Sequence, residues 1–88
     1  MSASPPPLVM RVLRAVRQAT GERRPPHWIG LDTLRLRIDQ LRLGQAIALA
    51  ERAGWLKVAG HPPLTVAITK AGLDAIDAAL AREDTAPE

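Results

Sequence analysis

The chain has 88 residues, 47% of them apolar, which suits one small domain and leaves no room for a second. It contains no cysteine, so disulfides and thiolate metal sites are excluded, and no apolar run approaches the roughly 20 residues that cross a bilayer. The net charge is +3, and with no signal-peptide pattern at the N-terminus we expect a soluble, cytoplasmic protein.

The first part of the chain predicts a leader, a long helix and a loop. Residues 1–7 are rich in proline and are expected to form a flexible leader. Residues 8–20 predict a helix with an apolar face and a basic face. The apolar face comprises Leu8, Val9, Val12, Leu13, Val16 and Ala19, and the basic face comprises Arg11, Arg14 and Arg17. Gly21 is a candidate C-cap, and Pro25 and Pro26 prevent a further helix, so a loop follows.

The central part predicts a short extended segment and two helices. Residues 27–31 suit a brief strand held by Trp28. Asp32 is the candidate N-cap of a short second helix with apolar positions at Leu31, Leu34 and Ile38, which leaves Arg35 and Arg37 exposed on that helix. Asp39 is the candidate N-cap of a third helix over residues 40–53. Its buried stripe is expected to consist of Leu43, Ala46, Ile47 and Ala50, and Gly54 ends it.

The last part predicts a hairpin and a final helix. Residues 55–58 and 64–68 suit two strands, the second with Leu64, Val66 and Ile68 alternating onto one face. Thr69 is the candidate cap of a helix with an apolar stripe of Leu73, Ile76 and Leu80. Residues 83–88 are expected to be a flexible acidic tail, so the predicted domain spans residues 8–82.

Charge is divided unevenly along the chain. Residues 1–57 carry ten Lys/Arg against four Asp/Glu, whereas residues 58–88 carry two against five. A basic front and an acidic tail suggest one side that faces a polyanion and another turned away from it. The alternative is an ordinary solvated surface that is rich in arginine.

The order of predicted elements resembles the winged-helix (winged helix-turn-helix) family of DNA-binding domains, in small bacterial and phage regulators, over residues 8–81. The sequence AERAGWL at residues 50–56 is similar to the family's junction between recognition helix and wing. Residues 64–72 are similar to the wing's return strand and the Thr-x-x-Gly start of the next helix. The resemblance implies an α+β fold, with a three-helix core, a two- to three-stranded antiparallel wing and a C-terminal helix.

The implied function is DNA binding by a transcriptional regulator, with the helix at 40–53 in the major groove and the hairpin at 55–68 as wing. Outward positions on that helix are the candidate base readers: Arg42, Gln45, Ala48 and Arg52. Arginine can read guanine, glutamine can read adenine, and alanine allows close approach to a thymine methyl. Candidate phosphate contacts elsewhere are Arg35, Arg37, Lys57, His61, Arg23 and Arg24, each with the ordinary alternative of solvated surface.

Two kinds of partner remain open. The first is double-stranded DNA bound by a homodimer that associates through the Ala-rich C-terminal helix or the first helix. The second is a protein, in which case the winged helix is an interaction module and the basic stripe of the first helix is one place to bind it. We expect Trp28 and Trp55 in the core or at its edge, with stacking of Trp28 on a base as the alternative.

Catalysis is not indicated by any pattern in the sequence. His27 and His61 have no carboxylate at ligand spacing, so neither a metal site nor a histidine base is expected. The glycines do not form a phosphate-binding loop, because Gly44 and Gly54 lie within a helix and at its end. We therefore expect no enzyme activity, no cofactor and no small-molecule ligand.

Overall fold

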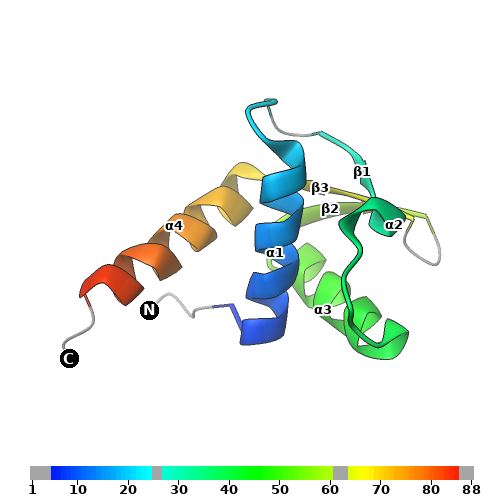
Figure 1. Ribbon diagram of the computed structural model, residues 1–88, viewed down its shortest axis with the longest axis horizontal. Helices are drawn as coiled ribbons and strands as arrows, with labels where there is room; N and C mark the ends of the chain where they lie inside the picture. The colour runs from blue at the N-terminus through cyan, green and yellow to red at the C-terminus, as the bar shows by residue number, and fades with distance from the viewer. Residues whose placement is uncertain (1–4, 25–26, 61–63, 86–88) are drawn as a thin grey trace.

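The computed structural model describes residues 5–24, 27–60 and 64–85, with side chains described as far as Ala81 in the last helix. These residues form four helices and a three-stranded antiparallel sheet of order β1-β3-β2 (Figure 1). The elements in chain order are α1 (Pro7–Thr20), β1 (Ile29–Gly30), α2 (Leu31–Leu34), α3 (Gln40–Arg52), β2 (Leu56–Ala59), β3 (Thr65–Ile68) and α4 (Lys70–Thr85). The predicted α+β class is confirmed. Over these residues, none of the helices combines the length and apolar character needed to cross a bilayer.

Helix α1 runs through the middle of the molecule and supplies much of the core. Pro7 opens the helix, where its missing N–H is not needed, and the Gly21 N–H closes it by donating to the Arg17 carbonyl at 3.0 Å. The predicted apolar face is correct except at its end, where Ala19 is exposed and Thr20 is buried instead. Thr20 lies four residues after Val16 and so continues the buried row, and its hydroxyl donates to the Val16 carbonyl at 2.8 Å.

The second helix is shorter than predicted. It forms a single turn that ends at Leu34, because Arg35 adopts a left-handed conformation with φ 48°. The N-cap position is occupied by Gly30, so the prediction of Asp32 as N-cap is wrong. The residues that follow, 35–39, form an extended connecting segment rather than a helix. Arg35 and Arg37 therefore lie in this segment and not on a helical surface.

Helix α3 is close to the predicted one. The Asp39 carboxylate accepts the Arg42 backbone N–H at 3.4 Å, which confirms the predicted N-cap. The buried residues are Ala46, Ile47 and Ala50, while Leu43 is half-buried against the same core. The chain leaves the helix through Gly54, whose φ of 81° is a conformation that glycine adopts without strain.

Strand β3 lies at the centre of the sheet and is the most deeply buried strand. It pairs with β2 through Leu56↔Ile68 and Val58↔Val66, and with β1 through Ile29↔Val66. Val66 and Ile68 are buried as predicted, but Ala67 between them is also fully buried, and Leu64 lies before the strand and is exposed. The predicted turn includes residues 61–63, which lie outside the described residues, as do Pro25, Pro26 and the two chain ends at 1–4 and 86–88.

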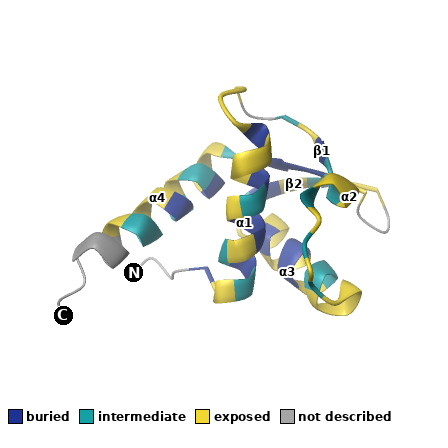
Figure 2. Ribbon diagram, in the orientation of Figure 1, coloured by how far each residue is buried: buried dark blue, intermediate teal, exposed yellow. Residues whose placement is uncertain are grey.

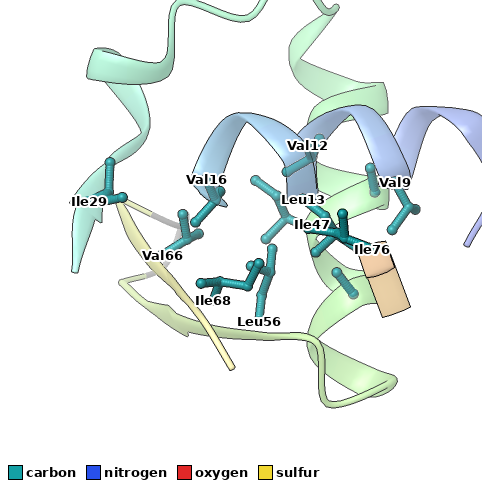
Figure 3. Packing of buried hydrophobic residues seen from close by; sticks show 12 residues of the cluster. Val9, Val12, Leu13, Val16, Ile29, Ile47, Leu56, Val66, Ile68 and Ile76 are labelled. Atoms are coloured by element: carbon teal, nitrogen blue, oxygen red, sulfur yellow. The ribbon is translucent and has the colours of Figure 1, made fainter. Parts of the chain in front are cut away.

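Side chains from every strand and from three helices meet in one core (Figures 2 and 3). In Figure 3, Leu13 of α1 lies among Ile47 of α3, Leu56 of β2 and Ile68 of β3. Ile76 brings α4 into the same cluster. The fully buried side chains of the core are all aliphatic, as the scarcity of aromatic residues requires. Trp55 is half-buried at its edge, as predicted, but Trp28 is 46% exposed because it precedes the two-residue strand β1 and lies outside the core.

The AERAGWL and Thr-x-x-Gly motifs are joined by hydrogen bonds just before β2 and α4 begin. The Thr69 hydroxyl donates to the Gly54 carbonyl at 2.5 Å and accepts the Gly72 N–H at 3.0 Å. The Thr69 N–H also donates to the Trp55 carbonyl at 3.1 Å. Thr69 is therefore the predicted cap of α4, and it also fastens that helix to the end of α3.

Candidate nucleic-acid interface

The outward face of α3 is the first part of the candidate site. Gln45, Ala48 and Arg52 are all exposed on the side of the helix opposite Ile47 and Ala50. No hydrogen bond or ion pair within the described residues engages the side chains of Gln45 and Arg52. Both side chains are therefore available to a partner.

Two exposed leucines, for which the sequence suggested no role, share this helix with the polar candidates. Leu41 is 71% exposed and lies on the same face as Gln45, four residues before it. Leu49 is 42% exposed and lies at the edge of that face. Helical periodicity places both leucines away from the buried stripe and therefore indicates that they are exposed. Their apolar character, taken alone, suggests the opposite. The face is consequently mixed, with apolar and polar side chains interleaved.

Arg42, the fourth predicted base reader, faces elsewhere. It lines a hollow of about 370 Å³ between the first turns of α1, the connecting segment and the start of α3. The residues that line this hollow are Leu8, Arg11, Arg37, Ile38, Asp39 and Arg42. We call it the arginine hollow. It brings Arg11, which is distant in the sequence, together with Arg37 and Arg42, and the sequence suggested a different role for each of these three arginines.

The remaining predicted phosphate contacts are scattered. Arg24 is exposed in the first loop, and Lys57 is exposed on β2. Arg23 Nη1 lies 2.7 Å from the ring Nε2 of His27. Because a guanidinium can only donate, the ring nitrogen accepts this hydrogen bond. Arg23 thus has a partner within its own loop. His61 lies outside the described residues.

Arg35 is an exposed cation in an unusual backbone conformation. Its φ of 48° is the only positive φ of a non-glycine residue among the described residues. A left-handed conformation costs roughly 1–2 kcal/mol for a residue with a Cβ, whereas glycine adopts it freely. The conformation of Arg35 turns the chain from α2 into the connecting segment, which carries Arg37 to the arginine hollow.

The basic stripe of α1 is divided between two surroundings. Arg11 lines the arginine hollow, whereas Arg14 and Arg17 line a second, more open hollow of about 600 Å³ beside Ile76 and Leu80 of α4. There the Arg17 guanidinium lies 3.3 Å from the Asp77 carboxylate, with 43% and 64% of the two side chains exposed. An ion pair this exposed contributes about 0–1 kcal/mol to stability, since water screens it. The stripe is therefore not a single binding surface.

The described residues contain no group of three or more His, Asp or Glu side chains that could hold a metal ion. Compared with protein-family models, with curated proteins and with solved structures, the chain gives no significant match. Any functional conclusion must therefore come from the exposed face of α3 and the arginines around it.

Proposed function

We propose that the chain is a DNA-binding domain of the winged helix-turn-helix type and acts as a transcriptional regulator. In this proposal α3 enters the major groove and the β2–β3 hairpin is the wing. The observation that carries it is the arrangement of α3, whose inner face is fixed in the core while its outer face presents Gln45, Ala48 and Arg52. A helix about 10–12 Å across fits the major groove, so this face can reach base edges.

Each side chain on that face has a matching base edge. Gln45 can bond adenine through two hydrogen bonds, and Arg52 can bond guanine in the same way. Leu41 and Ala48 offer apolar contact to a thymine methyl group. The face therefore has the donors and the apolar surface for direct readout, although it is small.

The conformation of Arg35 also supports the proposal. Strained backbone conformations tend to persist where the side chain serves a function. An arginine at a position that glycine would occupy without strain is explained if its guanidinium contacts a phosphate beside the groove.

A titration of labelled duplex DNA by fluorescence anisotropy tests this function. With sequences selected from a random pool, Gln45→Ala and Arg52→Ala should each weaken binding by about 1–3 kcal/mol, and should affect random DNA much less. Arg35→Ala should weaken binding to all sequences alike. If micromolar protein shows no salt-dependent binding between about 50 and 200 mM salt, the proposal is wrong.

A second function is favoured by the exposed leucines. Leu41 and Leu49 would suit a protein partner, for which the winged helix would be an interaction module. The second hollow, beside Ile76 and Leu80 of α4, is a place where two copies of the chain could associate under either function. Sedimentation equilibrium at known concentration, with and without duplex DNA, separates these cases. A dimer that binds DNA, whether it forms before or on the duplex, supports the first function, and a stable dimer that does not bind DNA supports the second.

A further inference from the structure

The arginine hollow concentrates positive charge in a concave site. Three arginines, from α1, the connecting segment and α3, line it together with one acidic residue, Asp39. The carboxylate is already used as the N-cap of α3, where it accepts the Arg42 backbone N–H. Leu8 and Ile38 supply apolar walls, and such walls strengthen the field inside a charged cleft.

The three arginines of this hollow outnumber its one acidic residue, Asp39. Within the described residues, no hydrogen bond or ion pair engages the guanidinium groups of Arg11, Arg37 or Arg42. Arg17, on the same helix as Arg11, has Asp77 as its partner. Like charges held near one another repel, so an anion placed among these three side chains would relieve the repulsion as well as accept their hydrogen bonds.

We propose that the arginine hollow binds one backbone phosphate of DNA, with Arg11, Arg37 and Arg42 as its ligands. The inference rests on the proposed function and deepens it. Guanidinium groups match phosphate oxygens through paired hydrogen bonds, which makes arginine suited to this anion. Arg42 then positions the protein and does not read a base, and α1 takes part in DNA binding through Arg11 alone.

The position of the hollow also orients α3. The hollow lies at the N-terminal end of that helix, beside Asp39, and Gln45 and Arg52 follow along the helix axis. One DNA strand would therefore cross the first turns of α1 and α3, and the base-reading face would extend from there into the groove.

The salt dependence of binding tests the phosphate contact. On a mixed-sequence duplex, Arg11→Gln, Arg37→Gln and Arg42→Gln should each weaken binding about tenfold. Replacing all three arginines by glutamine should reduce the magnitude of the slope of log K against log salt by about 1, because one phosphate is no longer neutralised. Arg14→Gln is the matched control, because it is also on α1 but lines the other hollow, and it should leave the slope unchanged. Far-UV circular dichroism of each variant checks that it folds.

The roles of Arg42 and Arg52 are separated by comparing a selected sequence with the mixed duplex. Arg42→Gln should weaken both to the same extent, whereas Arg52→Ala should affect the selected sequence more strongly. A loss confined to the selected sequence for Arg42→Gln would overturn its assignment to phosphate.

Titration with inorganic pyrophosphate distinguishes a failed site from a failed function. In NMR spectra of the whole chain, the Nε–Hε signals of Arg11, Arg37 and Arg42 should shift together, while those of Arg14 and Arg52 stay in place. If DNA binds but Arg11→Gln has no effect, the site is wrong and the DNA function stands. If pyrophosphate shifts the three signals but no DNA binds, the hollow binds anions, but a DNA phosphate is not its ligand. If neither occurs, both proposals fail.

Discussion

Gly72→Ala tests how closely α4 approaches the junction after α3. A Cβ added at Gly72 would overlap the Trp55 carbonyl oxygen and would lie 2.9 Å from Ile68 Cγ1. The carbonyl cannot move away easily, because it accepts the Thr69 N–H. In an unhindered helix, alanine in place of glycine stabilises by about 1 kcal/mol. Here overpacking costs about 1–3 kcal/mol and the disturbed hydrogen bond about 1 kcal/mol.

The net expectation is that Gly72→Ala lowers the free energy of unfolding by about 1–3 kcal/mol. For a domain of this size each kcal/mol lowers Tm by roughly 4–8 °C, so the effect is easily measured. Urea denaturation followed by tryptophan fluorescence and by circular dichroism gives the change. Gly44→Ala in α3 is the control, because an added Cβ there meets no atom within 4 Å and should stabilise by about 1 kcal/mol. If both variants were stabilised equally, the close approach of α4 to the Trp55 carbonyl would be refuted.

Substitutions at three further positions test local features of the structure by urea denaturation. Thr69→Val removes the hydroxyl that bonds Gly54 and Gly72, and should cost about 1–2 kcal/mol, whereas Thr69→Ser should retain most of the stability; equal loss in both would exclude the hydroxyl as the cause. Arg35→Gly relieves a left-handed backbone conformation, so it should leave the free energy of unfolding unchanged or raise it by up to about 1 kcal/mol, while DNA affinity falls. Marked destabilisation would contradict this. Leu41→Gln should change stability by less than about 0.5 kcal/mol because the side chain is exposed; a larger loss would mean that another surface covers it.

The two proposed functions make opposite demands on the outer face of α3. Direct base readout requires that Gln45 and Arg52 dominate the energy of binding, with the leucines as minor apolar contacts. A protein partner would reverse this order, since buried leucine contributes more to a protein interface than exposed glutamine. On a selected duplex, Gln45→Ala should therefore weaken binding more than Leu41→Gln, and the reverse order would contradict direct base readout.

Local patterns determined much of this protein. The core faces of α1 and α3 follow from apolar residues spaced three and four apart, and the ends of α3 follow from Asp39 and Gly54. The Thr-x-x-Gly start of α4 is also a local signal, since the Thr69 hydroxyl bonds an N–H three residues later. Such features depend on neighbours along the chain, and they are visible in the sequence for that reason.

Only the tertiary structure decided where the second helix stops and which arginines meet. Leu31, Leu34 and Ile38 have helical spacing, but the left-handed conformation of Arg35 ends α2 after one turn. Arg11, Arg37 and Arg42 share one hollow because α1, the connecting segment and α3 pack together, and no spacing along the chain encodes that contact. Along α1 and α3 the sequence alone determined most of the buried residues, since burial follows periodicity. The grouping of charges depends on packing between distant segments, and it was visible only in the folded chain.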